Sequence, residues 1–461
     1  MHATQGTKYT SSISLMADFE VWQKARFRFA VAVVLLNCFA AVFAAAQGKS
    51  GNSRYVGPGS CSASACHGGV QPMLNTRVLQ NEYSTWVVKD SHFRAFRSLQ
   101  SPISQRMGKL LGIGNPANSP KCLACHALAV SPERKGRDFD IGEGVSCESC
   151  HGPASAWLGP HTLRGWTTQQ SVALGMYDIM DVAHRSEKCL TCHLGTAEKE
   201  VDHKMIAAGH PDLVFELDSY SAIEPPHWRP SGDPNYGVRL WAVGQAIQLR
   251  EALKRLARRT QSGSWPEFSE YDCFSCHHSL TKPESSWRQE RGYERRGAGT
   301  PPWNSAHYTI LRILAKDIDS SASQQLETEL QNVYQVTSNM SSSPKGIGES
   351  AQRASELAAT LVTKINETKF DKERAGRLLQ EISAQGDSIS NQDTRSAEQA
   401  AMALDSLFIC YEKQGSTHPT VRAAIDGLFQ ELDNPSAYNA PRFSAQMHKV
   451  NTALHEAGIG Q

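Results

Sequence analysis

The organisation of this chain follows from one five-residue stretch, Cys122-Leu-Ala-Cys125-His126, and from its recurrence. The same C-x-x-C-H spacing returns as CESCH at 147–151, CLTCH at 189–193 and CFSCH at 273–277. With 12 Cys and 17 His in 461 residues, about 0.01 such units are expected by chance. In this motif two thiols bond to the vinyl groups of one porphyrin, and the adjacent imidazole then lies under the iron. The four units therefore predict four c-type haems.

A fifth unit, CSASACH at 61–67, keeps the same order of residues with a longer spacer between its cysteines. The flanking Gly57-Pro-Gly and Gly68-Gly69 are typical of a tight loop, which favours a fifth haem there. A disulfide followed by an unrelated histidine is the alternative for this unit. Zinc and disulfides are alternatives for the other four units, but neither requires a histidine after every second cysteine.

We therefore expect five covalently attached haem c groups, of which the one at Cys61 and Cys66 depends on the longer spacer. The predicted attachment residues are Cys61, Cys66, Cys122, Cys125, Cys147, Cys150, Cys189, Cys192, Cys273 and Cys276. The predicted proximal iron ligands are His67, His126, His151, His193 and His277. No catalytic residue is predicted.

The second axial ligand of each iron separates two functions. A second imidazole gives a saturated electron carrier, whereas an empty position permits small-molecule chemistry. His92 lies in an amphipathic, aromatic-rich segment, His161 lies in a loop rich in Gly and Pro, and His307 begins a predicted helix. His203 and His210 are seven residues apart, so two helical turns would place them on one face, where they could serve two haems. We expect these five histidines to be distal ligands, the alternative being ordinary structural or surface histidines.

The N-terminal region is typical of an export signal. Lys24, Arg26 and Arg28 precede an apolar run over 29–46 that ends in three alanines, and Met16 would give a signal of ordinary length. We predict a signal peptide within residues 1–46 and a periplasmic or exported location. The alternative is that residues 29–46 are retained and associate the protein with a membrane as an anchor.

Composition narrows the classes of partner. The chain has 47 basic and 46 acidic residues, and this near-neutral balance gives no electrostatic basis for nucleic-acid binding. With 40% apolar and 8% aromatic residues, the composition is that of a globular protein. We predict redox proteins as electron donor and acceptor, and no nucleic acid.

Motifs and periodicity divide the chain into parts. Residues 47–310 are predicted to form a multihaem domain, with four motifs in 61–193 and the fifth at 273–277. Because apolar periodicity is weak up to about residue 220, stacked haems would form the core of that domain. Residues 311–461 lack haem motifs and show helical periodicity, which predicts a bundle of about four helices. The predicted fold class is mainly α with extensive loops.

One segment of the predicted haem domain has a different character. Residues 236–259 form an amphipathic pattern that predicts a helix with cations near its C-terminal end. The basic run from Arg250 to Arg259 is interpreted either as a docking patch for an acidic partner or as a solvated helix face.

Four passages resemble the multihaem cytochromes c related to cytochrome c-554. They are the loop from Gly57 to Gly68, GVSCESCHGP at 144–153, KCLTCH at 188–193 and DHKMIAAGHP at 202–211. The resemblance covers about residues 55–310. It implies haems stacked in close pairs, mostly bis-histidine coordination, and electron transfer, often beside nitrogen-compound metabolism. One haem of that family can be five-coordinate, and the fifth motif here extends beyond its four-haem pattern.

With five predicted haems in a chain of this length, the protein also resembles pentahaem cytochrome c nitrite reductases. Those enzymes usually carry C-x-x-C-K at the active haem, and no such unit occurs in this sequence. The predicted function is therefore periplasmic electron transfer through about five, mostly bis-histidine haems. The alternative is an oxidoreductase that acts on nitrite, nitric oxide or hydroxylamine at one open haem.

Overall fold

A computed structural model describes residues 53–460, apart from 77, 264, 274–275, 278–300 and 416. The predicted signal peptide or anchor in residues 1–46 lies outside this part of the chain. Within the described ranges, no helix has both the length and the apolar character that crossing a membrane requires.

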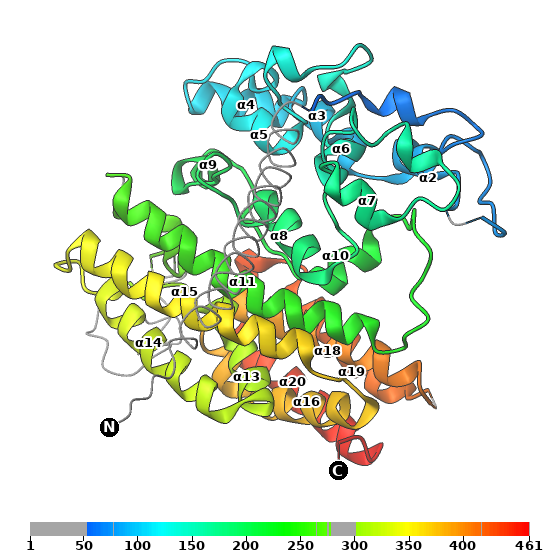
Figure 1. The fold of residues 1–461 in the computed structure, drawn as a ribbon. Coiled ribbons are helices and arrows are strands. Elements are labelled where there is room, and N and C mark those ends of the chain that lie inside the picture. The colour runs from blue at the N-terminus through cyan, green and yellow to red at the C-terminus, as the bar shows by residue number, and fades with distance from the viewer. Residues whose placement is uncertain are drawn as a thin grey trace, which may run out of the picture. The chain divides into compact units, whose positions relative to one another are not determined.

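The described part of the chain consists of helices and loops (Figure 1). Its β-type pairing consists of two isolated bridges, Tyr55 with Lys135 and Tyr271 with Trp303. The predicted mainly α fold class is confirmed. The described part of the chain divides into two compact units, the first from residues 53–56, Ser131–Arg137 and His151–Tyr177, the second from Gly57–Val130, Asp138–Cys150 and the described residues of 178–460.

The first unit is held together by polar contacts between its separate segments. The guanidinium of Arg134 donates to the Ser53 carbonyl at 3.0 and 3.1 Å and lies 4.8 Å from the centroid of the Tyr55 ring. Its helix α7 (Thr168–Ala173) begins with a capping box, in which Thr167 and Gln170 satisfy each other's backbone N–H groups.

The N-terminal half of the second unit has short helices and little side-chain core. Between residues 57 and 150, the buried hydrophobic side chains are Trp86, Leu99, Ala117 and Ala127. Side chains alone therefore form no continuous core there. The helices up to residue 223 are α2 (Glu82–Lys89), α3 (Ala95–Ser98), α4 (Pro102–Leu110), α5 (Pro120–His126), α6 (Cys147–His151), α8 (Val182–His193), α9 (His203–Ala207) and α10 (Leu217–Ile223).

The C-terminal half of the second unit is a helical bundle with a dense apolar core. Figure 1 shows α11 and α15 side by side along it, and α18 also packs against α11. Trp241, Tyr308, Tyr334, Phe408 and Phe443 are its largest fully buried side chains. The helices are α11 (Tyr236–Gln261), α12 (Ala306–Thr309), α13 (Leu311–Ile318), α14 (Ser320–Ser338), α15 (Pro344–Glu367), α16 (Lys372–Ala384), α17 (Gly386–Ser390), α18 (Thr394–Glu412), α19 (Pro419–Leu432) and α20 (Ala440–Glu456).

The described residues after 311 contain eight α-helices where periodicity predicts about four. The difference arises at capping residues. Asp319, Ser343, Asp371, Asp393 and Asn439 each precede a helix and accept a hydrogen bond from a backbone N–H of its first turn. Such side chains end one helical segment and start the next without a break in the apolar pattern.

Three arginines in the basic run of α11 are paired inside the protein rather than exposed to solvent. Arg250 pairs with Glu187 at 2.6 Å, so it ties α11 to α8. Arg255 and Arg259 both pair with Glu270, at 2.8 and 2.6 Å. Because Arg259 and Glu270 are almost fully buried, these cations hold α11 inside the protein rather than facing a partner. Seventeen of the 26 residues of α11 are buried, which explains why the amphipathic pattern alone is misleading.

Candidate haem-binding sites

Three C-x-x-C-H units lie at the ends of helices. The motif histidine is the last helical residue of α5 (His126), α6 (His151) and α8 (His193). Cysteines three residues apart on a helix lie on one face, and the following histidine begins the exit from the helix. Each unit thus presents both thiols and the imidazole to the same side of the chain.

The first motif, CSASACH at 61–67, reaches a similar arrangement through a folded loop. The His67 amide donates to the Cys61 carbonyl at 3.3 Å, and in the fifth unit the His277 amide donates to the Cys273 carbonyl at 2.8 Å. The chain then turns so tightly at Gly68 that a Cβ would lie 1.7 Å from the Ser62 carbonyl oxygen. Glycine is required there, and the longer spacer closes onto the same contact as the shorter one.

The motif cysteines are free thiols that approach one another in pairs. None of the ten forms a disulfide, including Cys61 and Cys66. The thiol of Cys61 lies close to that of Cys147, and the thiol of Cys125 lies close to that of Cys192. The first motif therefore lies beside the third, and the second beside the fourth.

Three motif histidines each lie opposite one of the predicted distal histidines. The ring centroids are 6.3 Å apart for His193 and His92, 6.3 Å for His126 and His210, and 6.2 Å for His277 and His203. Two imidazoles on opposite sides of one metal ion, each at a metal–nitrogen distance of about 2 Å, have centroids roughly 6 Å apart. The centroid separation in each pair therefore matches the separation expected for two imidazoles on one iron.

Two of the three distal-side histidines come from one short segment. His203 is the first residue of α9, and His210 follows the helix after Gly209, whose φ is +113°. The His210 amide folds back to the Met205 carbonyl at 3.0 Å. The segment lies near two motifs through a turn rather than through two turns of one helix, because α9 ends at Ala207.

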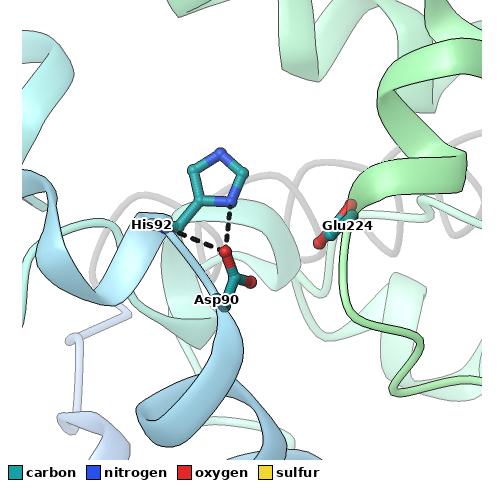
Figure 2. A group of neighbouring side chains, drawn as sticks. All are labelled: Asp90, His92 and Glu224. Carbon is teal, nitrogen blue, oxygen red and sulfur yellow. Dashed lines mark hydrogen bonds and ion pairs between the residues drawn. The ribbon is translucent and has the colours of Figure 1, made fainter.

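Several of these imidazoles have one ring nitrogen fixed by the protein. The Nδ1 atom lies 3.0 Å from Glu82 in His67, 3.0 Å from Asp90 in His92, 3.0 Å from the Ala95 carbonyl in His126 and 2.8 Å from the Pro211 carbonyl in His210. Figure 2 shows that the other nitrogen of His92 points away from Asp90. Fixing Nδ1 in this way orients the ring and leaves Nε2 for a metal.

The surroundings of the fourth motif show how the protein treats these rings. The hydrogen bond to Asp90 raises the pKa of His92, whereas burial lowers the pKa of His193. Phe215 stacks on the His193 ring at 5.0 Å, and Tyr220 lies edge-on at 5.3 Å. One imidazole is thus polarised by a carboxylate, and the opposite one is packed against aromatic rings.

The structure places His307 in a small cavity beside the fifth motif, because Arg395, which lines the same cavity, lies 3.5 Å from Cys273 Sγ. His307 lies on α12 and lines a cavity of about 30 Å³ together with Asp212, Arg255, Asn304 and Arg395. Its Nδ1 atom is buried without a hydrogen-bond partner among the described residues, and burial lowers its pKa to about 3. The ring that lies opposite His277 is that of His203.

His161 lies in the first unit, as His151 does. It packs edge-on against Trp157 at 5.6 Å, and its Nδ1 hydrogen-bonds to the Leu158 carbonyl. His161 therefore lies with the third motif in this unit, with its ring held by Trp157 and the Leu158 carbonyl.

The carboxylates that hold two of the rings were absent from the sequence prediction. Glu82 and Asp90 lie at the two ends of α2, within the amphipathic segment that contains His92, and Asp90 precedes His92 by two residues. Short spacing of this kind is the only local signal. Asp90, His92 and Glu224 also form the group of three potential metal-binding side chains within the described part of the chain, and it contains no cysteine.

The fold and these sites have the features of a c-type cytochrome over the motif-bearing part of the chain. Residues 59–152 match the model of the family described as cytochrome c554 and c-prime. This segment, which contains the first three motifs, is therefore similar to cytochromes of that family. No curated protein and no solved structure matches the chain.

Proposed function

We propose that this protein is an exported multihaem cytochrome that transfers electrons through five covalently attached haem c groups with mostly bis-histidine coordination. The observation that carries the proposal is the set of three imidazole pairs with centroids 6.2 to 6.3 Å apart. Each pair combines a motif histidine with one that is distant in the sequence. The match of residues 59–152 to cytochrome c554 and c-prime supports the same class.

The residues would act by holding and insulating the cofactors. The paired cysteines would form thioethers, and His67, His126, His151, His193 and His277 would be the proximal ligands. Haem iron supplies one-electron exchange between its ferric and ferrous states. With imidazoles on both sides, the protein's task is to fix spacing, tune potentials and exclude water, as Phe215 and Tyr220 do around His193.

The location and the partners follow from the same proposal. Haem attachment to C-x-x-C-H units and an N-terminal region typical of an export signal both support an exported or periplasmic protein. Such a carrier would exchange electrons with donor and acceptor proteins.

The proposal is tested by electron paramagnetic resonance (EPR) of the oxidised, fully loaded protein, with haem number counted by mass spectrometry. We expect five haems, low-spin signals throughout, and no change on addition of nitrite or nitric oxide, because two imidazoles leave no exchangeable position.

A high-spin signal that responds to either ligand would reveal an open haem and would replace the carrier with an oxidoreductase that acts on small nitrogen compounds. Fewer than five haems, with intact thiols at Cys61 and Cys66, would show that the first motif does not attach a haem.

A further inference from the structure

Two of the imidazoles that are candidate haem ligands have Nδ1 hydrogen-bonded to a carboxylate rather than to a backbone carbonyl. The Glu82 carboxylate lies 3.0 Å from Nδ1 of His67, and the Asp90 carboxylate lies 3.0 Å from Nδ1 of His92. Both acids are shielded, since the side chain of Glu82 is 15% exposed and that of Asp90 is 5% exposed. Shielding keeps solvent from weakening these two interactions.

A single short helix presents both carboxylates. Glu82 is the first residue of α2, and Asp90 is the residue that directly follows its last turn. Each is fixed by the backbone, because the Leu79 amide donates to Glu82 at 2.6 Å and the His92 amide donates to Asp90 at 2.8 Å. One end of α2 thus faces His67 of the first motif. The other end faces His92, whose ring lies near that of His193 in the fourth motif.

The second motif provides the contrast. There, His126 is paired with the Ala95 carbonyl at 3.0 Å, and His210 with the Pro211 carbonyl at 2.8 Å. A hydrogen bond to an anionic acceptor is stronger than one to a neutral carbonyl and makes the imidazole more basic. A more basic imidazole favours ferric over ferrous iron, because the ferric ion carries the larger positive charge.

We propose that Glu82 and Asp90 are positioning residues that lower the reduction potentials of the haems at the first and fourth motifs relative to the haem at the second. This inference rests on the proposed electron-transfer function and adds an order to it. The second-motif haem is reduced before the first- and fourth-motif haems, so α2 sets the energetic slope along which electrons move.

The test is EPR-monitored redox titration of the loaded protein carrying Asp90→Asn. Asparagine keeps the shape and an acceptor oxygen but removes the charge, so the ring stays oriented. We expect the ferric/ferrous equilibrium of one haem to shift at least tenfold toward ferrous, which raises its potential by about 59 mV. The low-spin g-values of the same haem should also change, since its ligand field weakens.

Glu224→Gln is the matched control. Ligand atoms of Glu224, Asp90 and His92 lie within 4.8 Å of one another, but the carboxylate that is hydrogen-bonded to His92 Nδ1 is that of Asp90 (Figure 2). The control removes a carboxylate from the same group without breaking that bond. An equal shift in both variants would show that general charge, rather than the hydrogen bond, sets the potential, and would overturn the proposal.

Glu82→Gln tests the first motif independently, so a failure of Asp90→Asn to mature does not leave the question open. Ser98→Ala is its control, because Ser98 Oγ lies 3.0 Å from Nδ1 of His126 and the carbonyl contact stays. We expect the potential to rise in Glu82→Gln and to stay unchanged in Ser98→Ala.

Failure of the inference and failure of the proposed function give different results. If the wild-type protein does not titrate as reversible low-spin haems, the electron-transfer proposal itself fails. If it does, and the haems of Asp90→Asn and Glu82→Gln titrate at the wild-type potentials, only the role of these two carboxylates is refuted.

Discussion

At the scale of single residues, Glu270 connects the bundle to the haem-bearing segments. It pairs with Arg255 and Arg259 of α11 while 2% of its side chain is exposed. The same arginines also donate to carbonyls of the haem-bearing part, Arg255 to Leu194 at 3.0 Å and Arg259 to Val201 at 2.9 Å. One carboxylate therefore neutralises the two cations that hold the chain between the fourth motif and His203.

We expect Glu270→Gln to lower the free energy of unfolding by about 3 to 5 kcal/mol, because it leaves two buried guanidiniums without their anion. Thermal unfolding followed by circular dichroism measures the effect. Glu251→Gln is the control on the same helix, and since Glu251 is only partly shielded, its loss should cost less than about 1 kcal/mol. Equal losses in the two variants would contradict this reading of Glu270.

The interaction of Glu270 with Arg255 and Arg259 makes the stability of the fold depend on pH in a defined direction. Burial alone would raise the pKa of Glu270, but the charges of Arg255 and Arg259 outweigh burial and lower it to about 2, below the ordinary value of 4.5. A lowered native pKa stabilises the fold above pH 4.5, and this contribution is lost as the pH falls from 4.5 toward 2. The wild type should therefore lose stability over that range more steeply than Glu270→Gln.

Residue-level prediction from the sequence succeeds where the chemistry is local. The motif cysteines and histidines are recognisable because the attachment reaction requires adjacent residues. The sequence also singles out His92, His203 and His210, which the structure brings opposite motif histidines. Their pairing could not be predicted, because partners are 74 to 101 residues apart and tertiary packing alone selects them.

At the scale of elements, α9 and the turn after it form a short strap between two sites. His203 lies opposite His277, and His210 lies opposite His126. The sequence instead leaves His307 as a candidate for the fifth site, because nothing local distinguishes it from His203. In the structure, the ring against His277 is that of His203, and α12 places His307 in a small cavity nearby.

This arrangement predicts a difference between two alanine variants. In His203→Ala, we expect the fifth haem to lose its second imidazole and to give a high-spin EPR signal that responds to added ligand. In His307→Ala, the spectrum should stay low-spin, because His307 lies on the cavity rather than opposite His277. The reverse pattern would identify His307 as the distal ligand and refute the role of the strap.

The helix α11 shows why element-level prediction from periodicity has a limit. Its amphipathic pattern predicts the helix correctly, but the basic residues at its end are paired with Glu187 and Glu270 from other parts of the chain. A charged residue looks the same in the sequence whether it faces water or a buried counterion. Only the position of the acid distinguishes the two.

At the scale of the whole molecule, the chain contains two kinds of interior. Among the described residues from 53 to 180, six hydrophobic side chains are buried, and three of them are alanines. By contrast, α11 alone buries twelve. Covalently attached haems would supply the missing apolar core in the first part, and the bundle does not need them.

We therefore expect protein produced without haem attachment to fold only in part. Limited proteolysis followed by mass spectrometry should cleave it throughout residues 57–180 and leave a resistant fragment that begins near α11, whereas the loaded protein should resist in both regions. Equal protection of residues 57–180 with and without haem would show that side chains and loops alone suffice to fold this part.

The seven-residue step from His203 to His210 also bears on how the protein is assembled. In a chain exported from its N-terminus, as proposed above, His210 would emerge after the second motif, so that this pair could close at once. His203 lies opposite residue 277, which emerges about seventy residues later. Maturation of the second site could thus precede that of the fifth, and attachment of the last haem would then lock the His203 end of the strap.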